Sequence, residues 1–366
     1  MMDELPKIPE YLLEEEEEFN FIRSLTTICA GIMLIGLAWY AYQLYTGEIN
    51  LIGPAEIVLE RDEAFDSLIQ LDSVGDLDGS GVAVCIVDSG ISLVHPDLSH
   101  VELSGWKDVV NSEPIPYDDH GHGTMMAGIL VADGGLRGVA PNVDLYVAKA
   151  LSSNGSGEDS SVAEAIDWCI SNGVNIISLS LGGASNGVSV IFGDAVEDAV
   201  DDAYDAGIVV VAAAGNDGQS DDGDVASPGT VSTVICVGAV NTAGNIWEGS
   251  SRGDNNGDLF KLLFPRGDPD KKPEVVAPGE GVPVLFGDDG WGMADGTSGA
   301  TVYVSGAVAL MFENKPELMD GGTDMLDDLK QWIMDSSLAR GDDGHDDKYG
   351  YGVLQIENLI AASQAD

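Results

Sequence analysis

Residues 82–90 read VAVCIVDSG, and this stretch decides the fold. Its first six residues are continuously apolar and rich in β-branched side chains, which is typical of a strand buried on both faces of a sheet. Similar apolar runs predict further strands at 143–149, 174–180, 208–213 and 233–239. Helical patterns occur at 122–132, 160–171, 193–206, 298–313 and 324–335. This alternation predicts an α/β fold of three αβα layers, with a mostly parallel central sheet between helices.

Asp88 follows the first strand, at the sheet edge where functional groups of parallel sheets collect. Two distant segments are expected at the same edge. HGHGTMMAG at 120–128 places His122 at the start of a helix, and DGTSGAT at 295–301 does the same for Ser298. Flanking glycines allow the tight backbone entry that both helices need. An acid, an imidazole and a hydroxyl together suit nucleophilic acyl transfer, in which serine attacks, histidine takes its proton and a carboxylate orients the histidine.

The start of a helix also offers unpaired backbone N–H groups, which can stabilise a developing oxyanion. Asn216 follows the predicted strand at 208–213, and its side chain can donate a further hydrogen bond to the same oxyanion. Each of these residues also has a structural interpretation. Asp88 in Asp-Ser-Gly and Asn216 before Asp-Gly are both typical of turns. His120 competes with His122, but only His122 stands between two glycines, so His120 is interpreted as a supporting or surface residue.

Further segments occur between and around these three. They are GSGVAVCIV at 79–87, HPDL at 95–98, RGVAP at 137–141, SLSLGG at 178–183, VVVAAAGNDG at 209–218, VICVGAV at 234–240, KPEVVAPG at 272–279 and YGYGVL at 349–354. In this order, and with Asp88, His122 and Ser298 in place, the chain resembles the subtilisin-like serine proteases, or subtilases, from 79 to 354. The resemblance therefore covers about three quarters of the chain.

The resemblance implies a serine endopeptidase that hydrolyses peptide bonds in proteins or peptides through an acyl-enzyme. Ser298 would be the nucleophile, His122 the general base and acid, Asp88 the orienting carboxylate and Asn216 the oxyanion donor. The expected substrate-binding residues form two short segments, one that pairs with substrate backbone and one that lines the primary specificity pocket. They are Ser180, Leu181 and Gly182, and Ala213, Ala214 and Gly215.

No cofactor is expected for the chemistry. Subtilases commonly bind calcium, and the aspartate-rich loops at 76–81 and 252–258 contain oxygen ligands. A chain with 63 acidic residues contains such clusters by chance, so no calcium ligand set is assigned.

The chain departs from the family pattern close to the proposed nucleophile. Subtilases usually carry methionine directly after the serine and a proline four residues after it, commonly followed by histidine. Here those positions are Gly299, Val302 and Tyr303, and Met125-Met126 follow the histidine segment where a polar or small residue and then valine are usual. Two alternatives therefore stay open: a subtilase-fold binding or scaffold protein with weakened turnover, and a membrane signalling subunit that senses peptides.

The net charge of −48 arises from 63 acidic and only 15 basic residues. Such a surface repels phosphates, which excludes nucleic-acid binding. An apolar content of 44% with clear periodicity argues against disorder. We interpret the charge as an adaptation to high salt like that of halophilic microbes, with other acidic proteomes as the alternative.

Residues 24–45 contain no charge over 22 positions, and Trp39, Tyr40, Tyr42 and Tyr45 gather toward one end. This pattern predicts an uncleaved transmembrane helix rather than a buried core helix. The glutamates at 14–18 argue against a cleavable signal peptide. Basic residues lie mainly before the span, which favours an N-terminus inside and a catalytic domain on the extracellular side.

The predicted organisation is therefore an acidic tail at 1–20, a transmembrane helix at 21–46, a tether at 47–72 and a peptidase domain at 73–364. The four cysteines do not form a disulfide framework by their spacing. Cys29 falls in the span, while Cys85, Cys169 and Cys236 lie in apolar strand or helix contexts, so buried free thiols are expected.

Overall fold

The computed structural model describes residues 10–46, 53–181, 189–191, 194–218, 224–253 and 266–365. The chain divides into two compact units, Met1–Gly53 and Pro54–Asp366, and each is described by itself. The first unit contains the helix α1, Glu10–Thr46. Its stretch from Phe19 to Tyr42 is long and apolar enough to cross a membrane, and its side chains are not buried within this unit.

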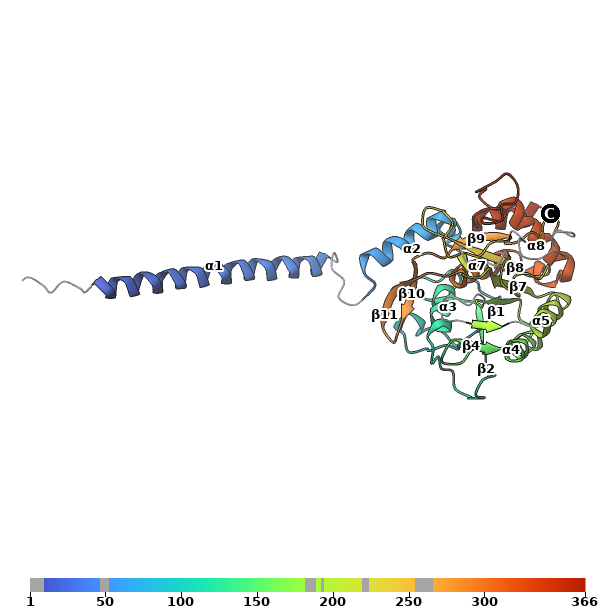
Figure 1. The fold of residues 1–366 in the computed structure, drawn as a ribbon, viewed down its shortest axis with the longest axis horizontal. Helices are drawn as coiled ribbons and strands as arrows, with labels where there is room; N and C mark the ends of the chain where they lie inside the picture. Colours follow the sequence, from blue (N-terminus) through green and yellow to red (C-terminus); the bar gives the residue numbers. More distant parts are fainter. Residues whose placement is uncertain are drawn as a thin grey trace, which may run out of the picture. The chain divides into compact units, whose positions relative to one another are not determined.

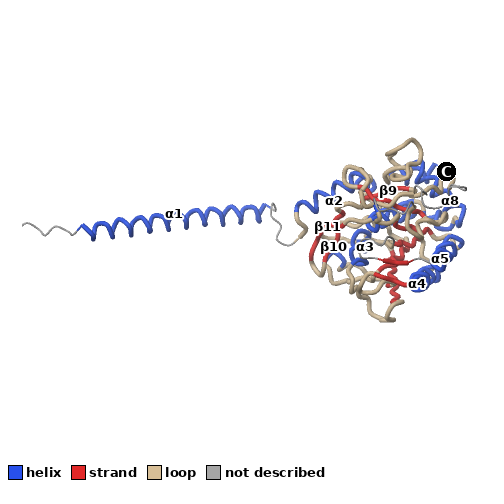
Figure 2. The backbone as a smooth tube through the Cα atoms, in the orientation of Figure 1, coloured by secondary structure: helices blue, strands red, loops and turns tan. Residues whose placement is uncertain are grey.

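The second unit contains a seven-stranded sheet whose neighbouring strands all run parallel (Figures 1 and 2). Its strand order is β2-β3-β1-β5-β7-β8-β9. The strands are β1 (Ala83–Asp88), β2 (Gly105–Asp108), β3 (Asp144–Lys149), β5 (Ile176–Leu179), β7 (Val209–Ala213), β8 (Ile235–Val240) and β9 (Val275–Pro278). The predicted α/β fold with a mostly parallel sheet is confirmed.

Helices pack on both faces of this sheet, as the alternation of strands and helices predicts. Side chains of β1 alternate between two cores: Val84 and Ile86 join one, Cys85 and Val87 the other. The first core contains side chains of α3 (His122–Val131), α7 (Thr297–Asn314), α8 (Gly322–Ser336) and α9 (Ile356–Ala365). The second contains side chains of α4 (Asp159–Ser171) and α5 (Asp194–Asp205), which lie together in Figure 1.

Smaller elements complete the unit. Outside the main sheet, β10 (Val282–Phe286) pairs antiparallel with β11 (Gly290–Ala294), and β4 (Ser156–Glu158) pairs parallel with β6 (Ser189–Ile191). Short 3-10 helices among the described residues include η1 (Leu71–Val74), η2 (Pro96–Leu98) and η4 (Pro316–Asp320). The hairpin β10–β11 matters for function because β10 packs against α3.

The structure corrects the expectation of a tether over 47–72. Residues Glu56–Leu68 form the helix α2, and its Val58 and Phe65 are buried in the first core. Ile69 and Leu71, which follow α2, are also buried there. The folded unit therefore begins at Pro54 rather than at residue 73. Residues 47–52 of the predicted tether lie outside the described residues.

The cysteines also differ from expectation. Cys85 on β1 and Cys169 on α4 form a disulfide, where buried free thiols were predicted. The two residues are 84 positions apart, but the strand and the helix pack face to face in the second core. Cys236 is a buried free thiol as expected, and burial raises the pKa of that thiol above its usual range. Cys29 is exposed on α1.

Candidate active site

Asp88 and His122 meet at the carboxyl edge of the sheet. Asp88 is the last residue of β1 and is fully buried, and His122 is the first residue of α3. The imidazole Nδ1 lies 2.8 Å from Asp88 Oδ1 and 2.9 Å from Oδ2. A carboxylate in this position holds Nδ1 as the protonated nitrogen, which leaves Nε2 able to accept a proton.

The Asp88 carboxylate changes the pKa of His122. Burial by itself would lower the pKa of His122, but the charge and hydrogen bond of Asp88 outweigh it and raise the pKa above its ordinary value. A raised pKa makes His122 a stronger base, and the same carboxylate stabilises the imidazolium that forms when a proton is accepted.

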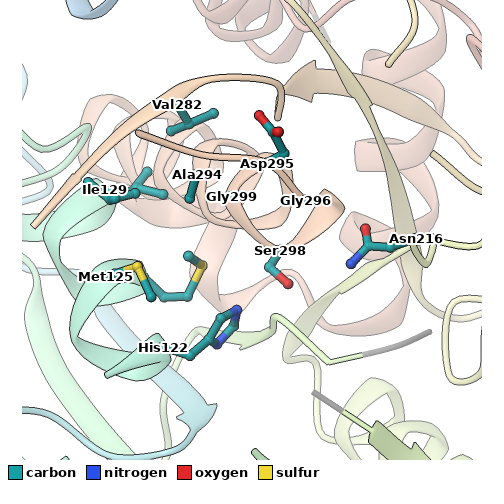
Figure 3. A pocket seen from close by; sticks show the side chains of 12 residues that line it. His122, Met125, Ile129, Asn216, Val282, Ala294, Asp295, Gly296, Ser298 and Gly299 are labelled. Carbon is teal, nitrogen blue, oxygen red and sulfur yellow. The ribbon is translucent and has the colours of Figure 1, made fainter. Parts of the chain in front are cut away.

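Ser298 lies in the first turn of α7, as the glycine-flanked segment predicts. Its Oγ donates to the Ser180 carbonyl at 3.0 Å, and Ser180 Oγ donates back to the Ser298 carbonyl at 3.0 Å. These two bonds join the end of β5 to the start of α7. Ser298 is 8% exposed and lines the same pocket as His122 (Figure 3). Ser298 Oγ is bonded to the Ser180 carbonyl and not to His122, and such contacts between reacting groups are often long or poorly aligned in sites without substrate.

Asn216 faces Ser298 from the loop that follows β7. Its Oδ1 accepts hydrogen bonds from Thr297 N at 2.9 Å and Thr297 Oγ1 at 3.0 Å. With the oxygen held in this way, the amide nitrogen points toward Ser298 (Figure 3). The side-chain amide and the backbone N–H groups at the start of α7 therefore face one region, which suits the stabilisation of an oxyanion.

Thr297 is a residue that sequence reasoning missed. It is fully buried, and its hydroxyl also accepts a hydrogen bond from Gly215 N at 3.1 Å. Thr297 therefore connects Asn216 and the 213–215 segment to α7, the helix that carries Ser298. Its position directly before Ser298 was the available signal in the sequence.

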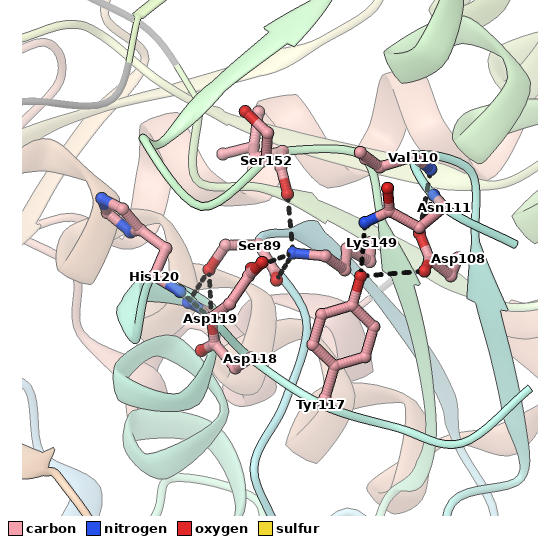
Figure 4. A network of polar contacts seen from close by, with 12 residues as sticks. Ser89, Asp108, Val110, Asn111, Tyr117, Asp118, Asp119, His120, Lys149 and Ser152 are labelled. Atoms are coloured by element: carbon pink, nitrogen blue, oxygen red, sulfur yellow. Dashed lines mark hydrogen bonds and ion pairs between the residues drawn. The ribbon is translucent and has the colours of Figure 1, made fainter. Parts of the chain in front are cut away.

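Asp118 was also missed, and it holds the start of α3. Its carboxylate accepts from Gly121 N at 2.7 Å and from Thr124 N at 2.8 Å. It also accepts from Ser89 Oγ at 2.9 Å (Figure 4). Burial alone would raise the pKa of Asp118, but the bonds from Thr124, Gly121 and Ser89 outweigh it and lower the pKa. Asp118 thus stays ionised, caps the helix that carries His122 and ties it to Ser89, the residue after Asp88.

A buried cation supports the same edge. Lys149, at the end of β3, is fully buried and donates to Ser89 O and Asp119 Oδ1 at 2.6 Å and to Leu151 O at 2.9 Å (Figure 4). Its ammonium also lies 4.8 Å from the centre of the Tyr117 ring. The only sequence signal was a single charge at the end of an apolar strand.

The start of α3 must approach β1 closely, which explains a glycine in the segment. A Cβ at Gly123 would collide with the carbonyl oxygen of Gly90.

His120 is half-buried beside Asp88 and His122, with its ring centre 6.3 Å from that of His122. Its Nδ1 is buried and has no hydrogen-bond partner within the described part of the chain. His120 is therefore a neighbour of the site, in keeping with its interpretation as a supporting residue.

The predicted substrate-binding residues do not line the pocket beside Ser298. Ser180, Leu181, Ala213, Ala214 and Gly215 are buried around the ends of β5 and β7, and Gly182 lies outside the described residues. The pocket instead contains the family departures Met125, Met126 and Gly299. Val302 and Tyr303 are buried farther along α7 and do not line it.

No calcium ligand set is found in the part of the chain that the structure describes. Within the 76–81 loop, Asp78 Oδ1 accepts from Ser80 and Oδ2 accepts from Asn142. No group of three or more His, Cys, Asp or Glu side chains among the described residues is placed to hold a metal ion. Residues 254–258 of the second aspartate-rich loop lie outside the described residues.

Comparisons with known proteins agree with this geometry. The model of the Subtilase family matches residues 79–352. Subtilisin DY of Bacillus licheniformis is 35% identical over 283 residues, which are 76% of this chain and 90% of that protein. A subtilisin of Bacillus pumilus is 38% identical over 243 residues, 65% of this chain and 79% of that protein. The minor extracellular protease Epr of Bacillus subtilis strain 168 is 32% identical over 284 residues, 77% of this chain but 39% of that longer protein.

Proposed function

Because the chain belongs to the subtilase family of serine endopeptidases, we propose that Ser298 is the nucleophile that attacks the peptide bond and that His122 is its general base. Subtilases need no cofactor for catalysis and often bind structural calcium. The observation that supports the assignment most is the contact between the Asp88 carboxylate and His122 Nδ1. His122 begins α3, and Ser298 on α7 lines the same pocket.

In the first half of the reaction, Ser298 Oγ attacks the carbonyl carbon of the scissile bond while His122 Nε2 takes the hydroxyl proton. The carbonyl oxygen becomes an oxyanion, which the Ser298 N–H and the Asn216 side-chain amide stabilise with hydrogen bonds. The tetrahedral intermediate collapses when His122 returns its proton to the leaving nitrogen. The C–N bond breaks, the amine product departs, and the acyl group stays on Ser298.

In the second half, water replaces the amine. His122 takes a proton from the water as its oxygen attacks the acyl carbon, and the oxyanion forms again at the same donors. Collapse breaks the bond to Ser298 Oγ, which recovers its proton from His122. The acid product leaves, and Asp88 stabilises the imidazolium in both halves without accepting a proton.

Substrate binding is proposed on the family pattern. The backbone at Ser180, Leu181 and Gly182 pairs with the acyl part of a protein or peptide substrate as an added strand. Ala213, Ala214 and Gly215 line the pocket for the residue before the scissile bond. No role for nucleic acid is proposed because of the net charge of −48.

Peptide hydrolysis tests this assignment. The full chain, solubilised in detergent, should cleave internally quenched peptides, and Ser298→Ala and His122→Ala should each abolish measurable cleavage while the far-UV circular dichroism is kept. Hydrolysis that persists at the wild-type rate in Ser298→Ala would refute the assignment of the nucleophile.

We also propose that the protease is tethered to a membrane by α1, which contains the predicted span at 21–46 and extends into the predicted acidic tail at 1–20. The support is the apolar stretch Phe19–Tyr42, which is long enough to cross a bilayer. The basic residues before the span favour a catalytic domain on the extracellular side.

Extraction and accessibility test the tether. The full chain should stay in membranes through carbonate extraction, and external protease should reach the catalytic domain of intact cells but not a tag at the N-terminus. Release of the chain by carbonate would refute the membrane span, and the reverse pattern of accessibility would place the catalytic domain inside the cell.

A further inference from the structure

Lys149 is a buried cation that the reaction steps above do not use. Its side chain is fully buried at the end of β3, although lysine is rarely buried without partners. All three N–H bonds of its ammonium have acceptors: Ser89 O and Asp119 Oδ1 at 2.6 Å and Leu151 O at 2.9 Å (Figure 4). Three segments of the chain therefore hold the ammonium in one place.

The bond to Ser89 connects Lys149 to the orienting carboxylate. Asp88 and Lys149 are paired across β1 and β3. Ser89 N donates to Asp88 Oδ1 at 2.6 Å, and Ser89 Oγ accepts from Gly123 N at 2.9 Å. Ser89 thus contacts both the carboxylate that faces His122 and the helix that carries His122. Because Lys149 holds the Ser89 carbonyl, it restrains the residue that makes both contacts.

The bond to Asp119 restrains the segment that carries the histidine. Asp119 lies three residues before His122, in the loop that leads into α3. Its side chain is 38% exposed, whereas that of Lys149 is fully buried. A hydrogen bond between two charged groups is stronger and shorter than a neutral one. One ammonium thus joins the segment after β1 to the segment before α3.

The stability that an ion pair contributes does not account for this buried cation. Removing an ammonium from water is costly, and an ion pair with an exposed carboxylate offsets little of that cost. Buried ion pairs can often be replaced by apolar side chains of similar volume with little loss of stability. An apolar side chain cannot, however, donate to three oxygens at fixed positions. The contacts of Lys149 therefore suit a role in holding the geometry of the site.

We propose that Lys149 is a positioning residue for peptide hydrolysis, which keeps the Asp88 carboxylate and the His122 ring in the relative orientation that the reaction needs. The proposal rests on the proposed function, because it takes His122 as the general base. Lys149 does not line the pocket beside Ser298, and it acts through Ser89 and Asp119. A displacement of about 1 Å in such a pair can lower turnover by about a hundredfold.

The pH profile separates positioning from a direct effect of charge. Burial lowers the pKa of His122, and Asp88 and Asp118 raise it. If Lys149 acted only through its charge, its removal would favour the imidazolium and move the acid midpoint of kcat/KM to higher pH. A loosened contact with Asp88 would instead disfavour the imidazolium and move that midpoint to lower pH. The titratable groups around His122 and Lys149 are Asp88 at the end of β1, Asp108 at the end of β2, and Tyr117, Asp118, Asp119 and His120 in the loop before α3.

Lys149→Met tests the proposal in the full chain in detergent, because methionine fills similar space and donates no hydrogen bond. We expect kcat for an internally quenched peptide to fall by about ten- to a hundredfold while KM changes by less than about twofold. The acid midpoint should move to lower pH. If Lys149→Met does not keep its far-UV circular dichroism, Lys149→Gln, which retains two N–H donors, should show the same direction of change. An unchanged kcat, or a midpoint that stays in place or moves to higher pH, would overturn the proposal.

Lys330→Met is the matched control. Lys330 is 4% exposed, and its ammonium donates to Asp270 and Glu274, but it lies on α8 and does not line the pocket. Its kcat and acid midpoint should match those of the wild type even if its melting temperature falls. An equal loss of kcat in both variants would show that the loss of any buried lysine has this effect, and would overturn the specific role of Lys149.

A second background tests whether Lys149 acts through Asp88. In Asp88→Asn, adding Lys149→Met should lower kcat by less than about threefold, because the carboxylate that Lys149 positions is absent. A loss as large as in the wild-type background would overturn the proposed route. Cleavage that persists in Ser298→Ala would overturn the proposed function and this proposal with it. Cleavage that is lost in Ser298→Ala but unaffected in Lys149→Met would overturn only the role of Lys149.

Discussion

Thr297→Val should lower turnover because Thr297 orients the proposed oxyanion donor. The substitution keeps the side-chain volume nearly constant and removes the hydroxyl. That hydroxyl donates to Asn216 Oδ1 at 3.0 Å and accepts from Gly215 N at 3.1 Å. The backbone N–H of Thr297, which also donates to Asn216 Oδ1, is not affected. The amide of Asn216 would thus lose one of the two bonds from Thr297.

The size of the effect follows from the number of bonds lost. One neutral hydrogen bond contributes about 0.5–1.5 kcal/mol, and about 1.4 kcal/mol is a tenfold change in rate. We therefore expect kcat to fall by about two- to tenfold with little change in KM. Removing the donor itself in Asn216→Ala should cost about a hundred- to a thousandfold, a range known for subtilisin itself and taken over for this chain. The unpaired Gly215 N–H should also lower the free energy of unfolding by about 1–3 kcal/mol.

Steady-state kinetics on a peptide substrate, together with urea unfolding, measures both effects. Thr301→Val is the matched control, because Thr301 is buried in the same helix but its hydroxyl donates to the Thr297 carbonyl and not to Asn216. Its kcat should match that of the wild type. An unchanged kcat in Thr297→Val, or an equal loss in Thr301→Val, would refute the idea that Thr297 acts through Asn216.

Three further predictions concern stability, pH and salt. Phe65→Ala on α2 should lower the free energy of unfolding by about 3–5 kcal/mol, because Phe65 is fully buried and packs against Tyr303. Leu59→Ala, at a 40% exposed position of the same helix, should lower the free energy of unfolding far less. If urea unfolding shows an equally small loss of stability in both variants, the interpretation of this segment as a tether would be restored. The midpoint of the acid limb in the pH profile of kcat/KM should lie above 6.5, the ordinary pKa of histidine, because His122 must be neutral to accept a proton and Asp88 raises its pKa. In Asp88→Asn this midpoint should move to lower pH, and a midpoint that stays in place would contradict the role of Asp88. The melting temperature of the full chain should rise from about 0.1 to 2 M salt as ions screen 63 acidic against 15 basic residues, and a flat curve would exclude the high-salt interpretation.

The main sheet was predictable where strands are continuous apolar runs. The stretch at 82–88 became β1, and the predicted helix at 298–313 became α7, Thr297–Asn314. Several strands were not predicted. The edge strand β2 (GWKD) and β11 (GWGMA) lack such runs, and the edge strand β9 (VVAP) and β10 (VPVLF) are apolar but short and contain proline. The α2 segment contains many charges, and its two buried residues, Val58 and Phe65, are separated by two helical turns. Burial there is decided by packing against the core, which local sequence does not display.

The candidate site was predictable only for the groups that are proposed to do chemistry. Asp88, His122 and Ser298 carry side chains whose combination has few other uses, so their types and spacing indicated the site. Thr297 and Asp118 act through hydrogen bonds to backbone and to other side chains, and threonine and aspartate have many such uses. The disulfide between Cys85 and Cys169 depends on which faces of β1 and α4 meet, and that is a property of the folded sheet.

The most direct test of the account is the site of covalent labelling by a fluorophosphonate probe. The probe phosphonylates a serine only where a base activates the hydroxyl and donors stabilise the oxyanion. We predict one adduct per chain by intact mass, located on Ser298 by peptide mapping, and no adduct in Ser298→Ala. An adduct on another serine, or a folded wild-type chain that takes no label, would contradict the central claim that Ser298 is the activated nucleophile.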